Sequence, residues 1–197
     1  MWLDRLVGVG KLSGADALAL SVTGPPLRAT GVNWDLRKSN PYCGYETYDF
    51  DVPTATEGDC YARYRVRIAE MRESLKIVRQ ALDRLPGGDY VAHDHKIAFP
   101  PRSELATSME ALIHHFKLAT EGYRVPAGEA YVAIESPRGE LGFFIVSDGS
   151  GTPYRVRVRA PSFYNLQAIS KIAEGAFVAD LVAIIGSLDP IMGEVDR

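Results

Sequence analysis

The chain has 197 residues, which fits one large domain or one and a half small ones. Its net charge is −3 and its hydrophobic fraction is 46%, a composition typical of a soluble globular protein with a sizeable core. The slightly acidic balance argues against nucleic acid or an anionic membrane surface as a direct partner. The longest nearly apolar run, residues 177–188, is too short to cross a bilayer and contains Asp180. Asp4 and Arg5 interrupt the start before an apolar segment develops, so we expect no signal peptide.

Residues 1–58 are rich in Gly, Pro and polar residues, which break regular structure repeatedly. We interpret them as a loop-rich covering segment with short strands, and residues 59–197 as a core of helices and antiparallel sheet. Five aromatic side chains of the covering segment need burial, namely Trp34, Tyr42, Tyr45, Tyr48 and Phe50. A segment built to cover something else predicts exposed apolar surface and self-association.

Two helices follow in the predicted core. Apolar residues alternate at spacings of three and four over residues 61–85, which predicts a long helix that Asp59 caps. The apolar stripe of this helix contains Tyr61, Tyr64, Ile68, Met71, Leu75, Val78, Leu82 and Leu85. A second helix is predicted from Ser103 to about Thr120, with Gly122 as its stop. We expect the two stripes to pack as an antiparallel helix pair.

The pattern then changes to a period of two, which is typical of strands. Three strands are predicted, over residues 129–135, 141–147 and 154–159. Turns rich in Pro, Gly, Asp and Ser join them into an antiparallel meander. Two short helices are predicted near residues 165–174 and 178–187. The predicted fold class is α+β, with a long antiparallel helix pair, a small three-stranded meander and C-terminal helices.

Several motifs suggest chemistry only weakly. The glycine spacing of residues 8–14 fits neither nucleotide-loop template. His93 and His95 would share a face of an extended segment and could bind zinc, but a third ligand is missing, so polar residues at an interface or strand edge are the favoured interpretation. Cys43 and Cys60 are too few for an iron–sulfur cluster and are interpreted as small buried hydrophobic residues. No metal site is predicted.

Arginines leave two interpretations open in each of two places. The third predicted strand carries three arginines on one face, Arg155, Arg157 and Arg159. In one interpretation this face is solvated or pairs with acidic side chains of the same chain. In the other interpretation it is a docking surface for an acidic partner. Arg138 lies in a turn between Glu135 and Glu140. It either forms a surface ion pair with these residues or is held over a buried site. No nucleophile–base arrangement is evident.

Four sequence strings are distinctive in combination. They are TGPPLRATGVNWDLRKSNPY at 23–42, ESPRGELG at 135–142, RVRAPSF at 157–163 and SLDPIMGEVDR at 187–197. Together they resemble the D subunit, the quinone-site subunit, of bacterial respiratory complex I, the NADH:quinone oxidoreductase, over essentially the whole chain. That family shares ancestry with the large subunit of nickel–iron hydrogenases. The resemblance implies the C-terminal half of a hydrogenase large-subunit-like fold.

The hydrogenase comparison suggests a role for residues 189–197, which we call the tail. Hydrogenase large subunits end near a DPCxxCxxH pattern, to which Asp189 and Pro190 correspond. Ile191 and Glu194 occupy the two thiolate positions, and Arg197 occupies the histidine position. Without the thiolates the site cannot hold nickel in that fashion. What the resemblance implies instead is the pocket that serves as the quinone chamber in complex I.

The residues assigned to this chamber are Asp189, Pro190, Ile191, Met192, Glu194, Asp196, Arg197 and Arg138. Ile191, Met192 and Val195 would line an apolar slot for the quinone ring, with ionisable groups at its edge to relay protons. No residue of this chain is assigned a catalytic role. An alternative is that Glu194, Asp196 and Arg197 form a network that fixes the tail against neighbouring subunits.

The resemblance implies a part of the peripheral arm of NADH:quinone oxidoreductase, on the cytoplasmic side of the bacterial inner membrane. Quinone is the substrate, no cofactor is expected on this chain, and the terminal iron–sulfur cluster belongs to the adjoining B subunit. The B and C subunits are the expected partners, and membrane contact runs through partner subunits only. Family members are roughly twice as long, so the chain alone should be inactive. The alternatives are a stand-alone interaction or assembly module and, opposed by the missing cysteines, a hydrogenase-like metal enzyme.

Overall fold

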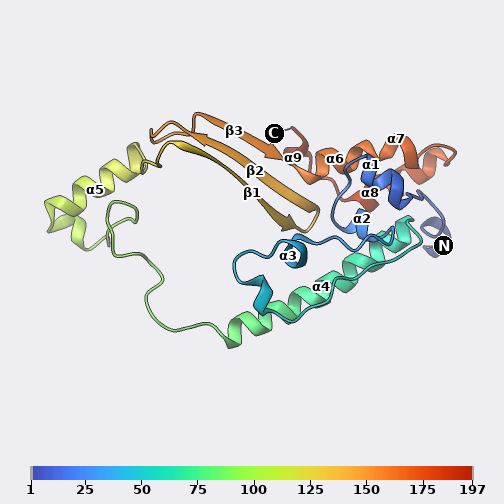
Figure 1. Ribbon diagram of the computed structural model, residues 1–197, viewed down its shortest axis with the longest axis horizontal. Coiled ribbons are helices and arrows are strands. Elements are labelled where there is room, and N and C mark those ends of the chain that lie inside the picture. Colours follow the sequence, from blue (N-terminus) through green and yellow to red (C-terminus); the bar gives the residue numbers. More distant parts are fainter. Residues whose placement is uncertain (1, 197) are drawn as a thin grey trace. The chain divides into compact units, whose positions relative to one another are not determined.

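The computed structural model describes residues 2–196 (Figure 1). Contacts divide the chain into two compact units. The first contains Met1–Arg84, Val132–Gly142 and Val158–Arg197, and the second contains Leu85–Tyr131 and Phe143–Arg157. The proposed division of the chain at residue 58 stays a prediction.

Short helices, and not strands, organise the start of the chain. They are α1 (Gly14–Ala19), α2 (Pro25–Arg28) and α3 (Leu36–Ser39), with 3-10 turns at Leu3–Arg5 and Tyr45–Thr47. The Ser13 hydroxyl accepts from the Asp16 amide, the Asp35 carboxylate accepts from the Arg37 amide, and Pro25 opens α2. These caps favour helical turns, and the predicted short strands are wrong for residues 2–58, where the structure contains none. Of the five aromatic residues predicted to need burial, Phe50 is buried, whereas Trp34 is 43% exposed.

The long helix α4 (Cys60–Asp83) confirms the predicted one, and Asp59 caps it by accepting a hydrogen bond from the Ala62 amide. Its buried residues are Cys60, Ala62, Arg63 and Val66, which lie outside the predicted stripe. Most of that stripe is exposed, including Tyr64, Met71, Leu75, Val78 and Leu82. The expectation of exposed apolar surface is therefore confirmed, while self-association stays a prediction.

Helix α5 (Met109–Thr120) ends where predicted but starts later. Its cap is Ser108, whose hydroxyl accepts from the Ala111 amide, and the predicted cap Ser103 precedes a separate 3-10 turn at Glu104–Ala106. The predicted stripe of α5 is also exposed at Met109, Leu112 and Phe116. Helices α4 and α5 belong to different units, so their predicted packing as an antiparallel pair stays a prediction.

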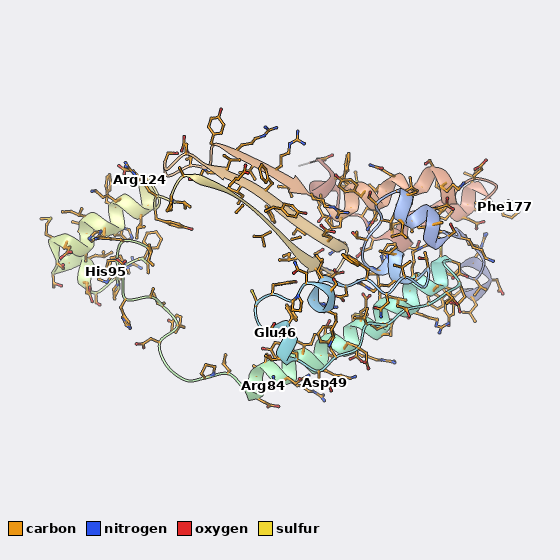
Figure 2. The ribbon with its side chains drawn as sticks, viewed as in Figure 1. Glu46, Asp49, Arg84, His95, Arg124 and Phe177 are labelled. Carbon is orange, nitrogen blue, oxygen red and sulfur yellow. The ribbon has the colours of Figure 1, made fainter. Side chains whose placement is uncertain are left out.

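The last part of the covering segment runs along α4. The Asp49 amide donates to Oε1 of Gln80 at 2.9 Å, and Arg84 Nη1 donates to the carbonyl of Thr47 at 2.8 Å. Figure 2 labels Asp49 and Arg84 at this point. Backbone polar groups of the loop are thus satisfied by side chains of the helix.

The three predicted strands are confirmed as β1 (Gly128–Ser136), β2 (Gly139–Ser147) and β3 (Arg155–Arg159), in the order β1-β2-β3 (Figure 1). Helices together with this small antiparallel sheet confirm the α+β class. The likeness to the hydrogenase large subunit stays a prediction.

The C-terminal region is more helical than predicted. It contains α6 (Pro161–Gln167), α7 (Ile169–Ile172), a 3-10 turn at Val178–Asp180, α8 (Leu181–Leu188) and α9 (Met192–Asp196). The first of these starts four residues early because Pro161 fits the first turn of a helix, and α9 was not predicted. One core cluster joins these helices to α4 and to the start of the chain: Leu12, Ala17, Val22, Leu27, Cys60, Ala168, Ile172, Ile184 and Leu188. Within residues 2–196, no helix combines the length and the apolar character that a bilayer crossing requires.

Candidate functional site

Two glycines bring the turn that carries Arg138 against the chain before α2. Gly24 has φ +75°, and a Cβ there would lie 2.5 Å from the Arg138 carbonyl oxygen. Gly139 has φ +134°, and a Cβ there would lie 2.5 Å from Oγ1 of Thr23. Both positions therefore need glycine for conformation and for space. Asn165 joins the two sides, since its Nδ2 donates to the Arg138 carbonyl at 3.0 Å and its Oδ1 accepts from the Thr23 amide at 3.1 Å.

The Arg138 side chain pairs with Asp189, with 3.2 Å between Nη2 and Oδ2. Asp189 follows α8 in the left-handed conformation, at φ +54°, which few residues other than glycine adopt. Neither acidic neighbour in the sequence supplies the ion pair that was one interpretation of Arg138. Glu135 pairs with Arg28, and a carboxylate oxygen of Glu140 lies 3.9 Å from Nε of Arg159. The structure thus joins two of the predicted site residues, 51 positions apart in the sequence.

Two cavities are lined in part by residues of this region. The polar cavity, of about 510 Å³, is lined by Arg28, Arg37, Tyr45, Arg67, Glu70, Met71, Ser74, Glu135, Ser136, Pro137, Arg138 and Asp189. The apolar cavity, of about 710 Å³, is lined by Trp2, Arg5, Leu6, Cys60, Tyr64, Arg67, Ala179, Asp180, Val182, Ala183, Gly186, Ser187 and Asp189. Arg67 and Asp189 are common to both linings.

A buried ion network forms one wall of the polar cavity. Arg28 is 1% exposed, and its guanidinium donates to Glu70 at 2.6 Å, to Glu135 at 2.8 Å and to the Trp34 carbonyl at 2.9 Å. Burial alone would lower the pKa of Arg28, but the charges of Glu70 and Glu135 outweigh it and raise the pKa. The wall is therefore held by a permanent cation between carboxylates.

Asp35 and Arg37 extend this network. Asp35 is 2% exposed and accepts from Arg37 Nη2 at 2.6 Å. Burial works to raise the pKa of Asp35, but the hydrogen bonds and charge of Arg37 dominate and lower it. For Glu135 the balance is reversed, because burial and the charge of Asp35 raise its pKa against the opposing effect of Arg28.

These opposite shifts predict opposite pH dependences of stability. Glu135, with a raised pKa, contributes stability that is present below about 4.3 and lost as pH rises through its folded-state pKa. Asp35, with a lowered pKa, contributes stability that is present above about 3.9 and lost as pH falls. For each variant we compare the difference in unfolding free energy, wild type minus variant. We expect this difference to decrease as pH rises for Glu135→Gln. For Asp35→Asn we expect it to increase as pH rises. Urea unfolding across this acid range measures both, and slopes of equal sign would contradict the assignment.

The tail residues assigned to the chamber lie in different surroundings. The Ser162 hydroxyl donates to the Glu194 carboxylate, and the same hydroxyl accepts from the Ile191 amide at 3.3 Å. Ile191 is 43% exposed and Met192 is 61% exposed, Pro190 is half-buried and Asp196 is exposed. Arg197 lies outside the described residues. Arg138 and Asp189 are therefore the assigned residues that the structure brings together at a cavity.

Sequence reasoning missed Arg67 and the Arg28 network. Arg67 Nη1 donates to the Ser187 carbonyl at 2.6 Å, and Arg67 lines both cavities. A usable signal was present, because Arg63, Arg67 and Glu70 recur at spacings of four and three on one face of α4. No role was predicted for that face.

The remaining candidates have ordinary surroundings. His93 is exposed and pairs with Asp89 at 2.9 Å. The described residues contain no group of three or more His, Cys, Asp or Glu that could hold a metal ion. Cys60 is buried, as predicted, whereas Cys43 is exposed, so that part of the prediction is wrong.

The arginine stripe of β3 divides into two environments. Arg155 and Arg157 are exposed. Arg159 donates to the carbonyls of Glu140 at 2.8 Å and of Ser21 at 3.2 Å, and these contacts lie within the first unit. Docking of an acidic partner on Arg155 and Arg157 stays a prediction.

These features define an α+β protein with two adjoining cavities, one apolar and one lined by buried ion pairs. Residues 1–197 match the family described as respiratory-chain NADH dehydrogenase, 49 kDa subunit, and the chain belongs to that family. The resemblance seen in the four sequence strings is thereby confirmed.

Curated relatives agree with this membership. The chain is 62% identical over 200 residues to the second NADH-quinone oxidoreductase D subunit of Roseiflexus sp. (strain RS-1), covering 100% of the chain and 48% of the relative. It is 63% identical over 200 residues to the first such D subunit of Roseiflexus castenholzii, again covering 100% of the chain and 48% of the relative. With the D subunit of Geotalea uraniireducens it shares 55% over 197 residues, which cover 100% of the chain and 50% of the relative. The chain thus spans about half the length of the curated relatives it matches.

Proposed function

We propose that the chain works as part of an NADH:quinone oxidoreductase and contributes one wall of its quinone-binding chamber, with Arg138 and Asp189 at the reacting edge. The names of the relatives support the first half of this proposal. The observation that carries the second half is the ion pair between Arg138 and Asp189, because Asp189 lines both an apolar and a polar cavity. A quinone needs such a combination, since its ring is apolar and its two oxygens are polar.

Each group has a definite task in this proposal. Reduction to quinol takes two electrons and two protons, and the electrons would come from an iron–sulfur cluster on the adjoining B subunit. Arg138 would orient a ring oxygen through its guanidinium, and Asp189 would hold or pass a proton at its carboxylate. The buried network of Arg28 and Glu135 would keep the Arg138 turn in place behind them. The chain alone would not turn over quinone.

The expected surroundings follow from the same proposal. The B and C subunits are the expected neighbours in the peripheral arm, on the cytoplasmic side of the bacterial inner membrane. Contact with the membrane would run through partner subunits. Glu194 and Asp196 either line the chamber edge or fix the tail, and the bond between Ser162 and Glu194 favours the second role for Glu194.

Asp189→Asn and Arg138→Gln, made in the assembled complex, test the proposal. We expect each to lower quinone reductase activity by at least about 100-fold, because Asp189→Asn removes a positioned proton-transfer group and Arg138→Gln removes the cation that orients the ring oxygen. NADH oxidation by an artificial acceptor that takes electrons before the quinone should stay unchanged, which shows that assembly is intact. Glu57→Gln and Arg65→Gln are the matched control, because these residues form an exposed pair at 3.4 Å. Unchanged quinone reductase activity in both test variants would reject the assignment.

A second candidate function is a non-catalytic interaction or assembly module. The observation that favours it is the exposed apolar stripe of α4, which contains Met71, Leu75, Val78 and Leu82. If this is the function, the two test variants keep full activity in the complex. Charged substitutions at Leu75 and Val78 then remove the chain from it.

A further inference from the structure

Three buried nitrogen atoms mark a place where the charge is not matched. In the part of the chain that the structure describes, the covered side-chain nitrogens and oxygens without a hydrogen-bond partner are Nε and Nη2 of Arg67 and Nε of Arg138. All three belong to the two arginines beside Asp189, and both arginines line the polar cavity. Buried donors normally have partners, so such a cluster calls for an explanation.

Among the described arginines that line the polar cavity, Arg67 is the one without a carboxylate partner. Arg28 and Arg37 have carboxylate partners within 3.0 Å, and Arg138 pairs with Asp189 at 3.2 Å. Arg67 donates to backbone carbonyls, those of Ser187 at 2.6 Å and of Arg63 at 3.5 Å. Burial lowers the pKa of Arg67, and the charge of Asp189 opposes that effect without forming an ion pair. Arg67 is half-buried as a whole, but two of its guanidinium nitrogens are covered without a partner, which is costly for the fold unless an anion can reach them.

The two sides of Arg67 indicate what such an anion looks like. On one side is the apolar cavity of about 710 Å³, with Leu6, Tyr64 and Val182 among its walls, which is room for a flat ring. Arg67 and Asp189 line that cavity as well as the polar cavity. The unpaired nitrogens are covered, so a ligand reaches them after a rotation of the long Arg67 side chain toward this cavity.

We infer that Arg67 binds an anionic oxygen carried on an apolar ring that enters the apolar cavity. This inference rests on the proposed function to the extent that a deprotonated quinol is the ring hydroxylate expected there. Arg67 favours the ionised oxygen over the neutral one, because an opposite charge at close range stabilises the charged form. Arg67 is then a binding residue of the site, next to Arg138 and Asp189.

The test uses two ring compounds that differ in charge. 2-Hydroxy-1,4-naphthoquinone is an anion at neutral pH, and 1,4-naphthoquinone has the same ring without the ionised oxygen. Titration calorimetry on the purified chain at low salt measures both. We expect the anion to bind at least about 10-fold more tightly, in keeping with a charge-assisted hydrogen bond. Arg67→Gln should remove this preference, and Arg67→Lys should keep part of it. Arg65→Gln, on an exposed position of the same helix, should leave it intact.

Three results would overturn the inference. The first is equal affinity of the two ring compounds for the wild-type chain, a result that does not depend on the folding of any variant. The second is a preference for the anion that survives Arg67→Gln. The third is acetate binding as tightly as the ring anion. Circular dichroism of the variants shows that a lost preference is not a lost fold. The proposed function fails separately, in the activity of Asp189→Asn and Arg138→Gln complexes, while ring-anion binding by the wild-type chain persists.

Discussion

Arg28→Ala is expected to lower the unfolding free energy of the chain by about 3–5 kcal/mol, the range for breaking a buried ion pair by removing one partner. Arg28 is 1% exposed and holds the carboxylates of Glu70 and Glu135 at 2.6 and 2.8 Å. Without it, the buried Glu135 and the half-buried Glu70 lose their cation. Equilibrium urea unfolding, followed by circular dichroism and tryptophan fluorescence, measures the change.

A matched surface pair provides the control for Arg28. Arg65 lies on the same helix as Glu70 and pairs with Glu57 at 3.4 Å, and both side chains are more than half exposed. Arg65→Ala should change the unfolding free energy by no more than about 1 kcal/mol. If Arg28→Ala and Arg65→Ala are equally mild, the buried network does not hold the wall of the polar cavity.

The sequence predicts those helices and strands that show a clear residue periodicity over several turns or positions. Helix α4 follows from its three-and-four spacing and the Asp59 cap, and the three strands follow from alternation between clear turns. The short helices α1 to α3 have four to six residues each and therefore show hardly one turn of periodicity. The available signals were the caps Ser13 and Asp35 and the initial Pro25 of α2, which lie in a region where Gly and Pro suggested loops.

Periodicity also fails to show which face of a helix is buried. The apolar stripe of α4 looked like the core face, yet Arg63 on another face is 0% exposed while Leu75 is 61% exposed. An apolar face is a packing surface, but its pattern does not tell whether the partner belongs to the same stretch of chain. A buried arginine is stabilised by carbonyls of distant segments, which no local pattern reveals.

Only part of the candidate site could be predicted, because some of its contacts join segments that are distant in the sequence. Arg138 and Asp189 were found through the family resemblance, and the structure brings them into contact. The partners of Arg28, by contrast, lie 42 and 107 positions away in the sequence. Such contacts depend on how α2, α4 and β1 meet, so they appear only once the tertiary structure is known.

Arg63→Ala is expected to cost about 3–5 kcal/mol of unfolding free energy, because it leaves buried acceptors unpaired and opens a cavity. Arg63 donates to the Gly58 carbonyl, the Gly10 carbonyl and the Ser187 hydroxyl, each at 2.9 Å. One side chain thus ties the start of the chain and the end of α8 to α4. Burial lowers the pKa of Arg63, and this cost of desolvation disappears with the side chain, which limits the loss. Urea unfolding gives the magnitude.

Amide hydrogen exchange distinguishes the loss of the Arg63 hydrogen bonds from a general loss of packing. The Leu12 amide donates to the Gly58 carbonyl at 3.0 Å and the Cys60 amide to the Val9 carbonyl at 3.0 Å, so both should exchange faster in Arg63→Ala. Arg63→Lys keeps the charge but cannot reach three acceptors in different directions, so its loss should be intermediate. Arg79→Ala, at an exposed position of α4, should leave both amides protected. Because Cys60 and Ser187 both line the apolar cavity, unchanged exchange in Arg63→Ala would mean that its wall is held by apolar packing and not by this arginine.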